Sequence, residues 1–342
     1  YQDFDVPEEQ RAQIFVEFGQ AIRKINPNVK IIGTVWSPPA WMKMNKKIVG
    51  PDSPSIRAGD YTRGERVATN RVDPKYFRHF AKWMIEYMKW HKANGVEFYA
   101  VSPGNEVQFS QRFESCVWSG EDYATIIGIL GEMMEAEGFG DVKIFGPETM
   151  TGHFYQGGTP QYFEAIFADP KAKKHFDVAA THGYTDGFTA DMSANSSARL
   201  WKFISKYDVP LWMTEGGTGA HDWPAPLEKG IASAIHNAFV AGHCSAFVPW
   251  QIAGGKPSSH CIMVMNEKTP KTYAAMHYFK FIPAGAQRID AEPGYGEVKA
   301  SAYHHPGDDM LTIVILNPGD RARSVNLSLT EVAPGRYAAD VD

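Results

Sequence analysis

Two glutamates stand directly after apolar segments that read as β-strands. The segment 98–101 (FYAV) leads through Ser-Pro-Gly-Asn to Glu106, and the segment 210–214 (PLWMT) leads directly to Glu215. Two carboxyl groups can hydrolyse a glycosidic bond with retention of configuration, if one protonates the leaving oxygen and the other attacks the anomeric carbon as an anion. The two glutamates are far apart in the chain, so only the fold can bring them together.

Each glutamate taken alone has an ordinary explanation. A single glutamate after a strand is most often a solvated loop residue or a helix cap. Here both follow an apolar segment, and each has a glycine close by, Gly104 and Gly216. In parallel α/β folds the chemistry sits at the carboxyl ends of the strands. We therefore interpret Glu106 and Glu215 as a catalytic pair.

Three polar residues near the same strand ends are candidates for substrate contacts. Asn105 precedes Glu106 and either binds a sugar hydroxyl or caps a turn. His182 and Tyr184 follow the strand-like segment 177–181. Tyr184 would hold the anionic glutamate by a hydrogen bond. His182 either lines the same wall or is a buried histidine with satisfied hydrogen bonds.

Aromatic residues make up 13% of the chain, including nine tryptophans. Most aromatic side chains in any protein pack in the core. Several here follow strand-like segments, where barrel loops would place them around a pocket: Trp36, Trp41, Trp118, Tyr184, Trp223 and Trp250. We expect Trp36 and Trp250 to floor a sugar-binding subsite, because flat apolar rings fit the apolar faces of sugars.

The bulk composition argues against several classes of protein. A net charge of −5 leaves no basic surplus for phosphates, so we expect no nucleic-acid partner. No apolar run is long enough to span a membrane, and 44% apolar with 21% charged residues is typical of a soluble globular protein. The three cysteines and the histidines lack metal-ligand spacing, and no Gly-x-Ser-x-Gly motif occurs. We expect no metal, no cofactor and no serine hydrolase.

Helix-like and strand-like segments alternate along most of the chain. The predicted strands are 30–35, 98–101, 142–146, 177–181, 210–214 and 245–250. The predicted helices are 8–25, 75–94, 121–137, 160–168, 195–206, 227–242 and 271–281. Short apolar strands between amphipathic helices are typical of a parallel α/β fold.

Six strand–helix units are two fewer than a (β/α)8 TIM barrel contains. We predict an α/β fold of that type that lacks its first two strands in this chain, with the helix 8–25 left over at the start. The alternative, a doubly wound open sheet, is disfavoured because no glycine-rich phosphate turn follows any strand.

The pattern changes after residue 283. Short strand-like segments at 298–303, 310–316 and 324–329 are separated by turns rich in glycine, proline and aspartate. These features predict a small C-terminal antiparallel β-domain. We therefore expect a catalytic barrel domain at 1–283 and a side domain at 284–342.

Five motifs together resemble glycoside hydrolase family 30. They are residues 36–43 (WSPPAWMK), 101–106 (VSPGNE), 182–184 (HGY), 214–216 (TEG) and 278–289 (YFKFIPAGAQRI). The resemblance implies a retaining (β/α)8 enzyme with the acid/base glutamate after the fourth strand and the nucleophile after the seventh. Glu106 and Glu215 match these positions, and Asn105 matches the asparagine before the acid/base. The last motif resembles the family's junction into its side domain.

The chain also departs from that family. The two first barrel strands and the N-terminal contribution to the side domain are absent, and the glucuronic-acid-binding cluster of bacterial glucuronoxylanases is not visible at 253–260. The sugar, the linkage, endo or exo action and the oligomeric state stay open. We expect a xylanase-like or β-glucanase-like hydrolase that degrades polysaccharide as a secreted or periplasmic protein. The alternative is a non-catalytic carbohydrate-binding protein on a degraded barrel.

Overall fold

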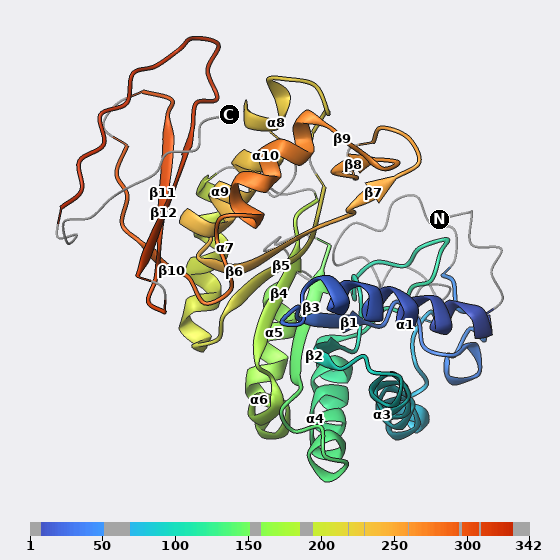
Figure 1. Ribbon diagram of the computed structural model, residues 1–342. Coiled ribbons are helices and arrows are strands. Elements are labelled where there is room, and N and C mark those ends of the chain that lie inside the picture. Colours follow the sequence, from blue (N-terminus) through green and yellow to red (C-terminus); the bar gives the residue numbers. More distant parts are fainter. Residues whose placement is uncertain are drawn as a thin grey trace.

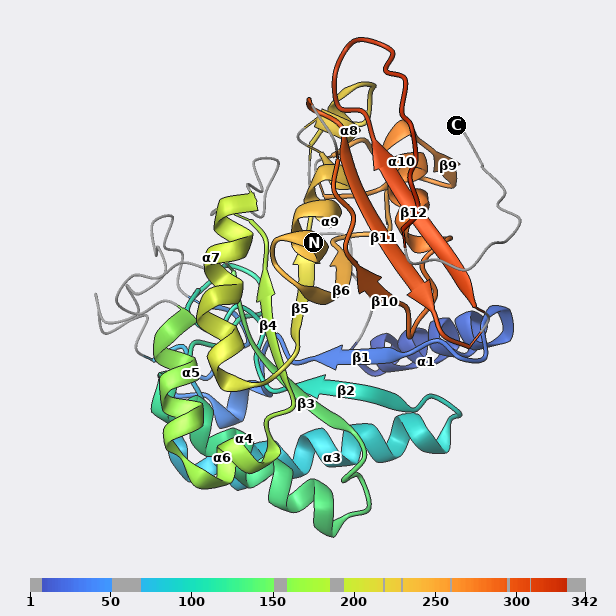
Figure 2. The same cartoon turned by 90° about the vertical axis from the view of Figure 1, so that its left-hand side faces the viewer.

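Figure 1 shows the computed structural model of the chain, which describes residues 8–50, 69–150, 159–184, 194–217, 219–228, 230–258, 260–293, 296–307 and 309–330. One curled sheet of parallel strands forms the centre, and most helices lie along its outer side (Figures 1 and 2). A small antiparallel sheet packs beside the helices that flank the last parallel strand (Figure 2).

The central sheet contains six strands in the order of the sequence. They are β1 (Ile31–Thr34), β2 (Phe98–Ser102), β3 (Lys143–Thr149), β4 (Val178–His182), β5 (Leu211–Gly216) and β6 (Cys244–Pro249). Every neighbouring pair is parallel. Parallel neighbours need crossover connections, which helices supply here. All six predicted strands are confirmed, and β3 is longer than predicted.

The seven predicted helices are also confirmed, and two short ones were missed. The helices are α1 (Glu8–Ile25), α3 (Phe77–Ala93), α4 (Gly120–Ala136), α5 (Thr159–Ala168), α6 (Pro170–His175), α7 (Ala194–Ile204), α8 (Ala225–Glu228), α9 (Ile231–Val240) and α10 (Pro270–Phe279). The missed helices are α6 and α8. A start signal for α6 is present, because Asp169 accepts from the first-turn N–H of Ala172 and Pro170 occupies the first position.

The two faces of the sheet carry separate apolar clusters. Successive side chains of a strand point to opposite faces. Val101 and Ile144 belong to the large cluster that joins the strands to the helices, whereas their neighbours Ala100 and Phe145 belong to a small cluster with Trp212. The large cluster fixes the sheet against its helices. The small one fills the concave side, below the strand ends that carry the candidate site.

The parallel sheet is open within the described residues. There β1 pairs only with β2, and β6 pairs only with β5. The fold is therefore a parallel half-barrel, which confirms the expectation that six strands do not close the eight-stranded barrel. Apolar side chains of α1 are exposed, among them Phe15 and Phe18, at 60% and 57%.

The C-terminal part forms the predicted antiparallel sheet, but one of its three strands differs from the prediction. Its strands are β10 (Gln287–Ile289), β11 (Lys299–His305) and β12 (Met310–Leu316), with β11 in the middle. The predicted strand at 324–329 is wrong. That segment is irregular and exposed even though its apolar residues alternate, because the third place in the sheet belongs to β10. The domain boundary at 283 stays a prediction.

A second small sheet was not predicted. It consists of β7 (Ala253–Gly254), β8 (Met263–Val264) and β9 (Glu267–Lys268), after β6. These two-residue strands are too short for a sequence pattern to show. In the described part of the chain, no helix combines the length and the apolar character needed to cross a bilayer.

Candidate active site

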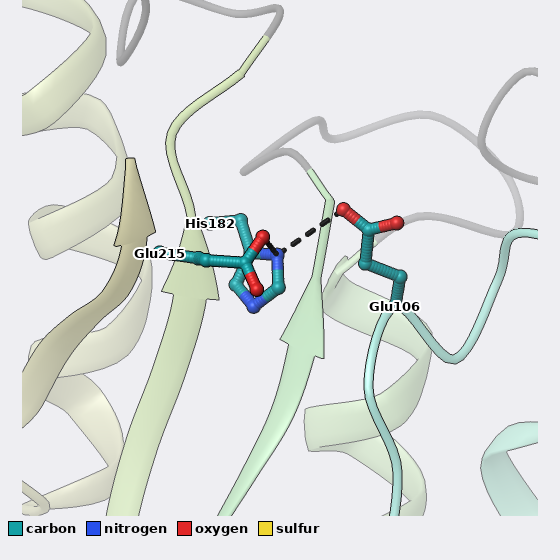
Figure 3. A group of neighbouring side chains, drawn as sticks. All are labelled: Glu106, His182 and Glu215. Atoms are coloured by element: carbon teal, nitrogen blue, oxygen red, sulfur yellow. Dashed lines mark hydrogen bonds and ion pairs between the residues drawn. The ribbon is translucent and has the colours of Figure 1, made fainter. Parts of the chain in front are cut away.

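Four charged side chains meet at the carboxyl edge of the half-barrel. Glu148 lies in β3, His182 ends β4, and Glu215 lies in β5 directly opposite His182 in the register. Glu106 comes from the loop after β2. Figure 3 shows Glu106 and Glu215 on either side of the His182 ring. The curled sheet therefore brings together the two glutamates that the sequence singled out, with a histidine between them.

Two of these carboxylates sit on left-handed backbone. The φ angle is 45° at Glu106 and 50° at Glu148, a conformation that costs a residue with a Cβ about 1–2 kcal/mol. The surrounding hydrogen bonds hold it in place. The Glu106 N–H donates to the Glu148 carbonyl at 2.9 Å, and the Asn105 N–H donates to the Val35 carbonyl at 2.9 Å. The turn after β2 is thereby fixed to its neighbours on both sides.

The distances within this group fit a retaining glycosidase. The Nδ1 atom of His182 lies 3.2 Å from Oε1 of Glu106 and 3.3 Å from Oε2 of Glu215. One oxygen of Glu106 and one of Glu215 lie within 4.8 Å of each other. Retaining enzymes place their carboxyl groups about 5–5.5 Å apart, whereas inverting enzymes need about 6.5–9.5 Å for an intervening water. The limit of 4.8 Å for one pair of oxygens is closer to the retaining than to the inverting separation.

Each glutamate of the pair accepts a hydrogen bond from a further side chain. The Tyr184 hydroxyl donates to Oε2 of Glu215 at 2.8 Å, which is the contact expected for this tyrosine. The Gln111 amide donates to Oε2 of Glu106. Sequence reasoning missed Gln111, because a glutamine five residues into an irregular loop carries no pattern that points back to the glutamate.

Burial has the largest influence on the pKa values of Glu215 and His182, and the charge of each on the other comes second. Burial raises the pKa of Glu215 to about 7, with Glu106 and Glu148 adding to the rise and with His182 and Tyr184 opposing it. The raised pKa of Glu215 disfavours its anion. The anion expected of a nucleophile depends instead on the two donors, the Tyr184 hydroxyl and the His182 ring.

The His182 ring is fully buried among carboxylates. Burial by itself lowers the pKa of His182, but Glu215, Glu106 and Glu148 outweigh it and raise the pKa to about 10. Glu148 approaches the other side of the ring, with Oε1 3.7 Å from Nε2. We call Glu106, Glu148, His182 and Glu215 the carboxylate–histidine cluster. The expectation that the chain holds no metal stays a prediction.

Three aromatic rings from loops that follow strands of the sheet contact one another. The ring centroids of Trp36 and Trp250 lie 5.4 Å apart, and Phe113 lies 5.5 Å from Trp36. All three side chains are half-buried. We call them the aromatic wall. Trp36 follows β1 and Trp250 follows β6, so the curl of the sheet brings together loops from its two outermost strands. Phe113 was not predicted, because its position depends on the loop after β2.

The other residues that the sequence suggested for substrate contacts or for a pocket lie in different surroundings. Asn105 is buried directly beside Glu106. Trp118 is wrong as a pocket residue, because it is fully packed in the core against Phe77 and Phe80. Trp41 is half-exposed and contacts Tyr76. The roles of the candidate residues in binding and catalysis stay predictions.

The chain matches a known family along most of its length. The family model described as "Glycosyl hydrolase family 30 TIM-barrel domain" covers residues 1–230. Among curated relatives, putative glucosylceramidase 1 of Caenorhabditis elegans is 24% identical over 87% of this chain and 57% of its own length. Glucuronoxylanase XynC of Bacillus subtilis (strain 168) is 26% identical over 81% of this chain and 61% of its own length.

A similar fold occurs among solved structures. The glycoside hydrolase family 30 subfamily 8 xylanase Xyn30A of Clostridium acetobutylicum superimposes with a TM-score of 0.70 at 21% identity. The match covers 90% of this chain and 68% of that one. The chain thus shares the barrel-type fold while spanning about three fifths of the length of the two curated relatives.

Proposed function

Because the chain belongs to glycosyl hydrolase family 30, we propose that it is a retaining β-glycoside hydrolase that cleaves β-linked poly- or oligosaccharides by double displacement. One observation carries the proposal. An oxygen of Glu106 and an oxygen of Glu215 lie within 4.8 Å of each other, at one edge of the parallel sheet. This spacing suits attack by one carboxylate while the other serves the leaving group.

The proposed reaction has two steps. In the first, Glu215 attacks the anomeric carbon and forms a covalent glycosyl–enzyme ester, while the leaving oxygen receives a proton through Glu106. In the second, Glu106 takes a proton from a water molecule that attacks the same carbon and releases Glu215. Two inversions give net retention. The Tyr184 hydroxyl stabilises the Glu215 anion before attack and after release.

The aromatic wall supports a carbohydrate substrate. Its rings are half-buried, so they combine a fixed position with an accessible face. Two of the relatives are named as a glucuronoxylanase and a glucosylceramidase, and another is named as an endo-1,6-β-D-glucanase. We propose a xylan- or β-glucan-type substrate and, since such polymers do not enter cells intact, a secreted or periplasmic location.

A turnover screen tests the proposal. The protein is incubated with xylan, β-1,6-glucan, β-galactan and a panel of aryl β-glycosides, with Glu215→Gln as the matched inactive control. We expect hydrolysis of at least one aryl β-glycoside, with the β-anomer appearing first by ¹H NMR. First appearance of the α-anomer would assign inversion. Binding of an oligosaccharide by calorimetry without turnover of any substrate would instead support the non-catalytic carbohydrate-binding alternative.

A further inference from the structure

A second polar region lies where helix α9 packs beside the antiparallel sheet of β10, β11 and β12 (Figure 2). Ser233, His236 and Phe239 are spaced three residues apart in α9, so their side chains share one face of the helix. The Phe239 ring contacts the ring of Tyr303 in β11, with centroids 6.2 Å apart. The Ser233 hydroxyl accepts from Nζ of Lys299 in the same strand at 3.2 Å. This face of α9 is therefore turned toward the sheet.

The sheet presents two cationic side chains to this helix. Lys299 and Tyr303 are an even number of positions apart in β11, so they lie on the same side of the sheet. Arg288 of β10 is directly opposite Tyr303 in the antiparallel register and shares that side. Arg288 also reaches the segment after α9, where its Nη2 atom lies 3.3 Å from Nδ1 of His243. Both cationic side chains are half-buried, so water screens their charges only in part.

The buried ring of His236 feels both cations. Its side chain is 7% exposed, and its Nδ1 atom is buried without a hydrogen-bond partner. Burial, followed by the charges of Lys299 and Arg288, lowers the pKa of His236 to about 4. Within the described residues, the side-chain partners of Lys299 and Arg288 are a serine and a histidine, and no carboxylate forms an ion pair with either. The region therefore gathers positive charge without a matching negative group.

The groups in this region are mainly hydrogen-bond donors. A guanidinium and an ammonium group carry N–H donors and no acceptor. Burial raises the pKa of the Tyr303 hydroxyl, and Ser301 and Arg288 oppose the rise, so this hydroxyl lies near the same cation. Two like charges at a partly buried interface also repel each other. An oxyanion would supply what the described residues lack here, a negative charge and acceptor oxygens.

We propose that a doubly charged tetrahedral oxyanion, of the phosphate or sulfate type, binds between α9 and the antiparallel sheet, held by Arg288 and Lys299 beside the His236 ring. We call these three residues the interface anion site. The two charges of the anion match the two cations, and its oxygens can accept from both at once. The bound anion links a helix of the half-barrel to the antiparallel sheet. None of the three residues belongs to the carboxylate–histidine cluster, so the proposal does not depend on the glycosidase activity.

Calorimetry with inorganic phosphate tests whether the site binds an oxyanion. The titration is run at about pH 8, where phosphate is mostly doubly charged, and sodium chloride keeps the ionic strength constant. We expect saturable binding of one phosphate per chain. Sulfate should compete with it, whereas acetate and additional chloride at the same concentration should not, because each carries a single charge. Absence of binding, or equal competition by chloride, would overturn the proposal.

Variants of the two cations locate the binding. Lys299→Met and Arg288→Gln should each weaken phosphate binding by about tenfold or more, because each removes a hydrogen bond between charged groups. Lys268→Met, the matched control, removes the same charge from an exposed position in β9 and should bind phosphate as the wild type does. Lys299→Arg keeps the charge and should retain binding. If Lys299→Met does not fold, the comparison of Arg288→Gln with Arg288→Lys carries the test. Equal affinity in all these variants would place the anion elsewhere and contradict the proposal.

The His236 ring reports the anion directly. Its resonances are assigned by comparison with His236→Gln and followed against pH with sulfate, which stays doubly charged over the range, or with chloride at equal ionic strength. The groups that face this region are Arg288 from β10, Lys299 and Tyr303 from β11, and Tyr278 from α10. None of them carries a negative charge below neutral pH, so a bound anion is the expected source of a stabilised imidazolium.

Sulfate should therefore move the titration of His236 to higher pH, because a nearby negative charge favours the protonated ring. A titration that does not move, or that moves equally in chloride, would refute the interface anion site. Neither measurement needs turnover. A protein that hydrolyses no glycoside would thus refute the proposed activity without touching this result, and a protein that binds no oxyanion would leave the proposed activity intact.

Discussion

The carboxylate–histidine cluster and the aromatic wall are built differently. The four cluster residues are at most 7% exposed, and they come from the middle strands β2 to β5 or directly after them. The rings of the wall are half-buried, and the two tryptophans follow the outermost strands, β1 and β6. Burial strengthens electrostatic interactions, whereas an accessible ring can contact a ligand. The comparison indicates that the chemistry is fixed inside the sheet and that substrate binding is left to its rim.

This contrast leads to separate kinetic expectations. Changes in the cluster should act on kcat and on its pH dependence, because they alter charge at the reacting atoms. Changes in the wall should act mainly on KM, because they remove binding that is equal in the ground state and the transition state. The variants below test that division, from the largest expected effect to the smallest.

Glu215→Ala should reduce turnover by more than about 10⁴-fold, beyond the usual contribution of general acid–base catalysis, because it removes the nucleophile itself. Azide should restore activity with an inverted product, since a small anion can fill the vacated position and attack once. Product stereochemistry is read by ¹H NMR of the glycosyl azide. Activity that survives on every substrate tested would place the nucleophile elsewhere.

Glu106→Ala should slow substrates with poor leaving groups by about 10²- to 10⁴-fold, because their leaving oxygen needs a proton. Aryl glycosides with good leaving groups should form the covalent intermediate at nearly the normal rate. Their slow second step should be accelerated by azide, this time with retained configuration. If the results for the two glutamates are exchanged, so are their roles.

Tyr184→Phe should cost about 10- to 100-fold in kcat/KM below neutral pH, because it removes a hydrogen bond to a charged group. The hydroxyl lowers the pKa of Glu215, so its loss raises that pKa. The active form is the anion, which exists above this pKa, so the acidic limb of the pH profile should move to higher pH. A limb that stays in place would show that the hydroxyl does not act on the nucleophile.

Trp36→Ala and Trp250→Ala should each weaken substrate binding by about 1.4 kcal/mol, or about tenfold in KM, with little change in kcat. Initial rates over a range of oligosaccharide concentrations separate the two constants. Trp90→Ala, a change at an exposed tryptophan on α3, is the matched control and should leave both constants unchanged. A tryptophan variant that loses kcat alone would remove the distinction between wall and cluster.

Most of the fold could be predicted because its signals are local. An apolar stripe at helical spacing or a short β-branched run shows in a few neighbouring residues, and the six parallel strands followed from such runs. The errors concern segments that become strands only if a neighbouring strand pairs with them. The alternating segment 324–329 is not a strand, whereas β10, only three residues long, is one. A strand exists only where another strand accepts its hydrogen bonds, and the sequence does not state which one will.

The candidate site divides in the same way. That Glu106, Glu215 and Tyr184 lie at one edge of the sheet could be predicted from their positions after apolar strands. Gln111 and Phe113 could not, since both depend on the path of the irregular loop after β2. Glu148 closely follows the strand-like segment 142–146, but the sequence does not show that it faces His182. For His182 the sequence left two possibilities, a residue lining the site and a buried histidine with satisfied hydrogen bonds. The structure shows a buried ring next to Glu106 whose Nε2 atom has no hydrogen-bond partner.

The sequence by itself determined which residue types stand at the strand ends, and hence the class of chemistry available to this protein. Only the tertiary structure decided how close those residues are and which of them hold protons. Strand ends are set by short-range patterns, whereas the charge state of a buried cluster depends on distances of a few ångströms between residues from four separate segments. His182 shows the difference most clearly, because the three carboxylates around it raise its pKa to about 10, whereas an imidazole on the surface has a pKa of about 6.5.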